Sequence, residues 1–144
     1  MELTSVRRGK RLLVPLTMAV LAGAVIGAGV DRYAFAQQPG IKRTILEKTD
    51  DPGSANYEAV LGVAELPPGA TSGKHRHPGV ELGYVLSGSV VVEHEGGATA
   101  TYSAGQAFTN KGGVHNARNP GTTPVKILAV YIVKKGVPMA EPVK

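Results

Sequence analysis

The chain has 144 residues, 42% of them hydrophobic, a size that fits one domain built around one core. It contains 19 Gly, 10 Pro, 2 Phe and no Trp, a composition that favours short strands joined by turns over a bundle of long helices. Cysteine is absent, which excludes disulfides, thiolate zinc sites, iron-sulfur clusters and a thiol nucleophile. The net charge is +5, but the residues after position 36 carry only +2 and contain no basic run, so no nucleic-acid partner is expected.

The first 36 residues have the three parts of a secretory signal peptide. A basic stretch, Arg7–Arg11, precedes an apolar run, Leu12–Val30, and the small-residue pattern Ala34-Phe35-Ala36 follows it. Cleavage is expected after Ala36. The alternative is an uncleaved membrane anchor, because the apolar run could just span a bilayer. Both interpretations predict an exported domain, periplasmic or extracellular, because the basic flank stays in the cytoplasm.

The sequence of the mature chain predicts an all-β sandwich or barrel. Residues 37–56 are polar and are expected to form an extended N-terminal arm, residues 57–136 the barrel, and residues 137–144 an extended C-terminal tail. Short apolar or alternating runs, separated by Gly, Pro and Asn turns, predict seven strands. These are Tyr57–Leu66, Val80–Leu86, Ser89–Glu95, Ala98–Tyr102, Phe108–Asn110, Val114–Arg118 and Val125–Val133.

Three of the four histidines have a spacing that suits metal binding. His75 and His77 are two residues apart, so on an extended backbone their imidazoles project to the same face. Glu81 follows four residues later, and His115 lies near the start of a later strand. Three imidazoles and one carboxylate suit one divalent transition metal (Mn, Fe, Co, Ni, Cu or Zn) and leave one or two positions open in a six-coordinate shell. A His-x-His pair alone more often marks a solvated turn, so this pattern is weak without its surroundings.

Other polar residues favour structural interpretations. His94 ends a strand and is expected to be solvated, and Tyr84 alternates away from Glu81 toward the outer face. Asn119 could hydrogen-bond a ligand, but a turn residue before a proline is an equal alternative. Lys111 and Arg118 flank His115 and could meet an anionic substrate, although ordinary surface charge is favoured.

Two segments resemble the sequence motifs of the cupin superfamily. The first motif matches at every fixed position, and the second matches with one residue fewer after its first glycine, with Asn110 where proline is usual. The matching residues are Gly69, His75, His77, Glu81 and Gly88, followed by Gly105, Gly112, His115 and Asn119. The resemblance implies a small double-stranded β-helix, jelly-roll-like barrel in which His75, His77, Glu81 and His115 point at one metal.

Cupins include enzymes and binding modules, so the fold leaves two functions open. One is a metal-dependent, dioxygenase-type enzyme resembling the small quercetinase-like cupins, acting on a small oxygen-bearing substrate, with Glu81 as fourth ligand or general base. The other is a non-catalytic module that binds or senses a small ligand or metal. The resemblance also implies a homodimer, and Val125–Val133, apolar on both faces, is typical of a strand covered on both sides.

Overall fold

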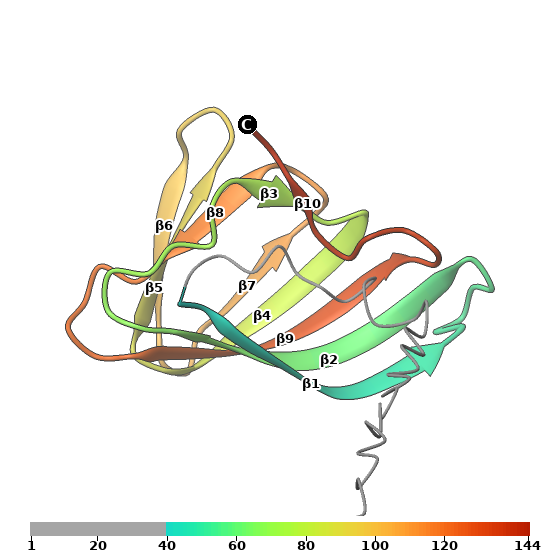
Figure 1. Cartoon of the computed structure of the whole chain (residues 1–144), viewed down its shortest axis with the longest axis horizontal. Helices are drawn as coiled ribbons and strands as arrows, with labels where there is room; N and C mark the ends of the chain where they lie inside the picture. Colours follow the sequence, from blue (N-terminus) through green and yellow to red (C-terminus); the bar gives the residue numbers. More distant parts are fainter. Residues whose placement is uncertain (1–39) are drawn as a thin grey trace, which may run out of the picture.

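The computed structural model describes residues 40–144, which form two five-stranded antiparallel sheets (Figure 1). One sheet has the order β1-β2-β9-β4-β7 and the other the order β10-β3-β8-β5-β6. The strands are β1 (Lys42–Asp50), β2 (Tyr57–Leu66), β3 (His75–Arg76), β4 (Gly79–Ser87), β5 (Ser89–His94), β6 (Thr99–Ser103), β7 (Ala107–Asn110), β8 (His115–Arg118), β9 (Val125–Lys134) and β10 (Glu141–Pro142). The predicted all-β fold is confirmed.

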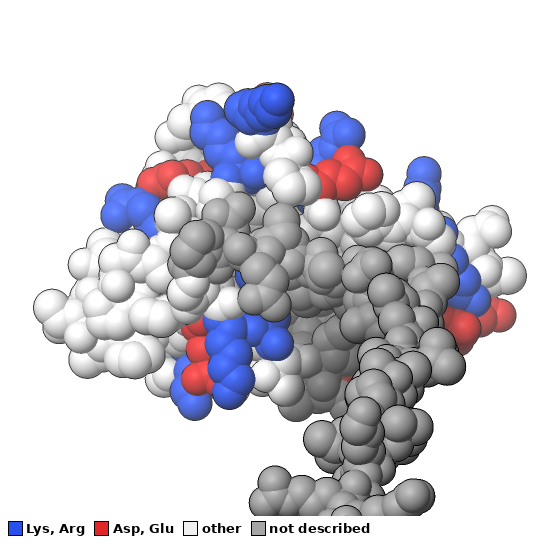
Figure 2. Space-filling view, in the orientation of Figure 1, with Lys and Arg blue, Asp and Glu red and all other residues white. Residues whose placement is uncertain are grey.

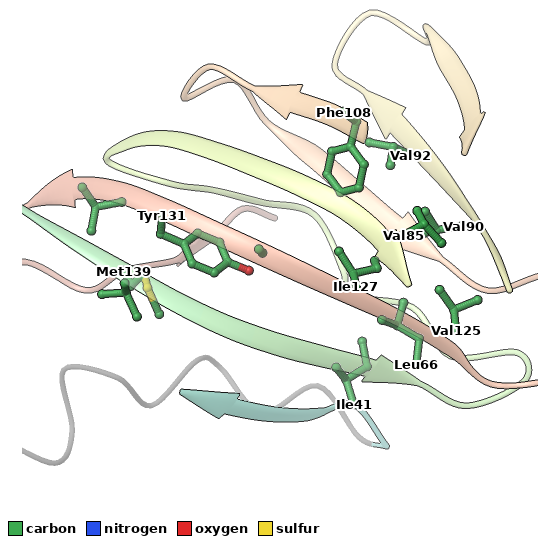
Figure 3. Close-up of a cluster of buried hydrophobic side chains, with 13 residues drawn as sticks. Ile41, Leu66, Val85, Val90, Val92, Phe108, Val125, Ile127, Tyr131 and Met139 are labelled. Carbon is green, nitrogen blue, oxygen red and sulfur yellow. The ribbon is translucent and has the colours of Figure 1, made fainter. Parts of the chain in front are cut away.

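The core lies between the two sheets and is built mainly from alternating residues of β2, β4 and β9. In β9 each second side chain from Val125 to Val133 is buried, as the period of two in a strand requires. Figure 3 shows Tyr131 and Met139 at one end of the cluster and Val85, Val90 and Val125 at the other. The buried apolar cluster comprises Ile41, Val60, Leu66, Val85, Val90, Val92, Phe108, Val125, Ile127, Ala129, Tyr131, Val133 and Met139.

Three strands lie where the sequence analysis placed no strand. The 37–56 arm contains β1, which pairs with β2 along most of its length and covers the outer edge of the first sheet. The 137–144 tail contains β10, which pairs with the two-residue strand β3. The expected signal peptide or anchor, residues 1–36, lies outside the described residues. Among residues 40–144, the structure contains no helix long and apolar enough to cross a membrane.

The outer face of the first sheet carries apolar side chains. On β4, Leu82, Tyr84 and Leu86 are each nearly half exposed, whereas Glu81 and Val85 are buried. The expectation that Tyr84 lies on the outer face is therefore confirmed. On the face seen in Figure 2, basic and acidic side chains lie near one another around the periphery.

Candidate metal centre

The structure brings together the four residues that the sequence analysis selected. His75 lies on β3, His77 follows that strand, Glu81 lies on β4 and His115 begins β8. One ligand atom from each of the three histidines lies within 4.8 Å of the other two. His75 and His115 face each other in the β3–β8 ladder, which explains how residues 40 positions apart meet. The three-His cluster is consistent with a metal site.

Each of the three imidazoles is oriented by a backbone carbonyl. A carbonyl oxygen only accepts hydrogen bonds, so the Nδ1 facing it must carry a proton, and in the neutral ring Nε2 then keeps its lone pair. This is the tautomer that presents Nε2 to a metal. The three bonds run from Nδ1–H of His75 to Gly73 O (2.8 Å), of His77 to Met139 O (2.7 Å) and of His115 to Gly113 O (3.0 Å).

Glu81 faces the imidazoles from the opposite sheet. Its Oε2 lies 3.5 Å from Nε2 of His77 and 3.4 Å from Nε2 of His115. The Asn110 side-chain amide donates a 2.6 Å hydrogen bond to the same oxygen. Burial by itself would raise the pKa of Glu81, but the facing imidazoles of His115 and His77, which attract a negative charge when they are protonated, and the Asn110 hydrogen bond hold it well below the ordinary value. The carboxylate is therefore ionised at neutral pH.

The electrostatics of the cluster favour a bound cation. Burial lowers the pKa of His75 to about 4, so this imidazole is neutral at physiological pH. Burial is the largest influence on His115 and opposes its protonation, but the interactions with Glu81 and with the Gly113 carbonyl together outweigh it and raise the pKa of His115. The Nε2 of His77 is buried and has no hydrogen-bond partner. Lone pairs on nitrogen and a carboxylate oxygen facing one another repel unless a proton or a metal lies between them, so the donor set fits a divalent transition metal.

Two further polar residues border this site and were missed in the sequence. Tyr131 lies directly opposite Glu81 in the β4–β9 ladder, with its ring centroid 4.9 Å from that of His77. Burial and the charge of Glu81 raise the pKa of Tyr131 well above its ordinary value, so the phenol keeps its proton. Arg43 on β1 is partly buried between two exposed neighbours, and its guanidinium interacts electrostatically with Tyr131 and Glu81. Burial lowers the pKa of Arg43.

The remaining residues singled out in the sequence lie around the site. His94 was expected to be a solvated strand end. It is partly buried and lies opposite His115 in the β5–β8 ladder, with the two ring centroids 6.5 Å apart. Arg118 pairs with Glu93 at 2.7 Å, and Lys111 is exposed. Asn119 is buried at a turn, where its amide donates to two backbone carbonyls.

A cavity of about 350 Å³ opens beside His115. His94 and Glu93 of β5 line it on one side, and Val143 and Lys144 of the C-terminal tail on another. The cavity is larger than a ligand of a few heavy atoms needs, and His115 is the one candidate ligand that lines it.

Comparison with known proteins agrees with this architecture. Residues 62–131 match the sequence profile of the Cupin_2 family, described as a cupin domain. The oxalate-binding protein of Thermotoga maritima is 39% identical over 80 residues, which are 54% of this chain and 65% of that protein. The chain thus spans just under two thirds of the length of this relative.

Solved structures show the same fold. A conserved protein with a double-stranded β-helix domain from Klebsiella pneumoniae superposes with a TM-score of 0.60 and 22% identity, covering 79% of this chain and 93% of that one. KdgF from a Halomonas species superposes with a TM-score of 0.54 and 26% identity, covering 69% of this chain and 84% of that one. The two antiparallel sheets are those of the cupin double-stranded β-helix fold, and residues 62–131 of this chain match the Cupin_2 domain of the cupin superfamily.

Proposed function

We propose that this cupin binds one divalent transition metal through His75, His77, His115 and Glu81, and that the metal takes a small carboxylate ligand of the oxalate class. The observation that carries the proposal is a cluster of three imidazoles, each with Nδ1 held by a carbonyl, in which two of the rings face one buried carboxylate. When bound, such a metal supplies a Lewis acid with positions left open for an oxygen donor.

Two observations support a small carboxylate as the ligand. The Thermotoga maritima relative at 39% identity is an oxalate-binding protein. In this chain, the partly buried guanidinium of Arg43 interacts electrostatically with Glu81 and Tyr131, so a positive charge lies near the cluster. Such a charge offsets part of the cost of bringing an anion out of water.

A calorimetric titration tests this proposal. The protein is stripped with a chelator and reconstituted in turn with Mn²⁺, Co²⁺, Ni²⁺, Cu²⁺, Zn²⁺ and, under anaerobic conditions, Fe²⁺, and its metal content is measured by elemental analysis. Oxalate, malonate and acetate are then titrated into the loaded and the stripped protein. We expect about one metal per chain and metal-dependent binding of oxalate. A folded protein that retains no metal would refute the proposed centre, and a loaded protein that ignores all three acids would refute the proposed ligand class.

Turnover of the ligand is the second candidate function, and Glu81 favours it. Its carboxylate is ionised, buried beside the imidazoles and held by Asn110, so it can accept a proton from a bound substrate. In the dioxygenase-type reaction predicted from the sequence, both atoms of O₂ end in the product. Oxygen uptake with a panel of catechols, diketones and flavonols tests it. Uptake in a one-to-one ratio with substrate loss would favour the enzyme over the binding module.

Export of the domain completes the proposal. The Arg7–Arg11 flank and the Ala34-Phe35-Ala36 site support export with cleavage after Ala36. N-terminal sequencing of the protein recovered from the periplasm would show Gln37 first if cleavage occurs. Retention of the full-length chain in the membrane fraction would favour the anchor instead.

A further inference from the structure

The C-terminal segment Met139–Val143, here called the strap, runs beside the strand that carries His75 (Figure 1). In the strap, β10 pairs with β3 at two positions, Glu141 opposite Arg76 and Pro142 opposite His75. On its other side, β3 pairs with β8 at one position only. The strap therefore provides the longer of the two ladders that hold β3.

Two further contacts tie the strap to the same stretch of chain. The backbone N–H of Val143 donates to the carbonyl of Lys74 at 2.9 Å. The Arg76 guanidinium and the Glu141 carboxylate form an ion pair at 2.9 Å. Contacts on both sides of His75 thus fix the backbone from residue 74 to residue 76.

The strap also sets the orientation of His77. Its ring donates from Nδ1 to the carbonyl of Met139 at 2.7 Å, in a buried hydrogen bond that joins residues 62 positions apart. The other two imidazoles are oriented by carbonyls of their own loops, Gly73 and Gly113, two residues upstream of each. The Met139 side chain is 2% exposed and packs in the core, which anchors this carbonyl.

We infer that the strap is a positioning element of the metal centre: it holds His77 in the Nδ1–H tautomer and fixes His75 against His115. The inference rests on the proposed function only for its effect on metal binding. Because the strap lies outside residues 62–131, the cupin domain alone would lack one of the three carbonyls that orient the imidazoles. Losing such a partner typically costs about 10- to 100-fold in metal affinity.

A pair of truncations of the full chain tests the inference. One ends at Pro138 and removes the strap, and the matched control ends at Val143 and removes only Lys144. Long-range ¹H–¹⁵N spectra of the metal-free proteins report the His77 tautomer and the protection of its Nδ1 proton. We expect the strap deletion alone to lose that protected proton and to bind Co²⁺ or Zn²⁺ about 10- to 100-fold more weakly.

A charge reversal keeps the test valid if the deleted chain fails to fold. Glu141→Lys places like charges at the β3–β10 ladder while keeping Met139, and Arg76→Glu with Glu141→Lys restores opposite charges. We expect the single variant to increase exchange of the His77 Nδ1 proton and the double variant to restore its protection. An unchanged Nδ1 proton in the folded strap deletion, or in Glu141→Lys if the deletion does not fold, would overturn the inference. A full chain that binds no metal but shows these changes would support the positioning role while refuting the proposed metal centre.

Discussion

Replacing His115 with alanine should weaken binding of a divalent transition metal by about 10²- to 10³-fold. Structural zinc sites with four protein ligands bind with roughly 10 to 16 kcal/mol, so one ligand contributes about 2.5 to 4 kcal/mol, and about 1.4 kcal/mol corresponds to a factor of ten. The His115 side chain is buried, and its Nε2 lies 3.4 Å from the Glu81 carboxylate. Alanine offers no donor at that position.

His94 provides the matched control for this measurement. It lies directly opposite His115 in the β5–β8 ladder, with the ring centroids 6.5 Å apart, but it is not one of the three clustered histidines. His94→Ala should leave the affinity nearly unchanged. Competition with a chromophoric chelator for Co²⁺ or Zn²⁺ at neutral pH gives both affinities, and circular dichroism checks the fold. Wild-type affinity in folded His115→Ala, or an equal loss in His94→Ala, would refute the assignment of His115 as a ligand.

Four further changes test the site, the fold and the assembly. Glu81→Gln should weaken metal retention only slightly, measured by elemental analysis, while turnover of any substrate found by oxygen uptake falls about 10²- to 10⁴-fold; full metal with undiminished turnover would make Glu81 a spectator. The His75 pKa is about 4 in the folded protein and about 6.5 in the unfolded chain. Between these pH values the unfolded chain binds more protons than the folded protein does. The metal-free protein should therefore lose up to about 3 kcal/mol of stability as the pH falls from about 6.5 to about 4. Urea denaturation should show a flatter profile for His75→Gln, and an identical profile would contradict the assigned pKa. Gly83→Ala places a Cβ 2.2 Å from Cζ of the Phe108 ring and should cost about 1 to 3 kcal/mol in the same assay; wild-type stability would show that the ring moves freely. Leu82 is 46% exposed on the outer face of β4 and should lie in the interface of the predicted dimer. Light scattering should therefore find a dimer for the wild type and a monomer for Leu82→Glu. A monomeric wild type would contradict the predicted dimer.

Local patterns determined the strands with clear ends and the choice of candidate ligands. Tyr57–Leu66 was predicted with the bounds of β2, because Pro67-Pro68-Gly69 cannot continue a strand. The spacing of His75 and His77 selected two imidazoles that do lie together, since an extended backbone places alternate side chains on one face. Glu81, four residues further on, meets them from the opposite sheet. These features depend on neighbours within a few residues, which the sequence displays directly.

Only the tertiary structure decided which distant residues complete the site. β10 is two residues long and contains a proline, so it has no local strand signal and exists because β3 lies beside it. β9 is apolar on both faces, and its pairing with β4 is what directs Tyr131 toward Glu81. The hydrogen bond from His77 to the carbonyl of Met139 has no sequence signature, because every residue has a backbone carbonyl oxygen that could accept it. Backbone groups and long-range strand pairing therefore orient ligands that the side-chain pattern could only nominate.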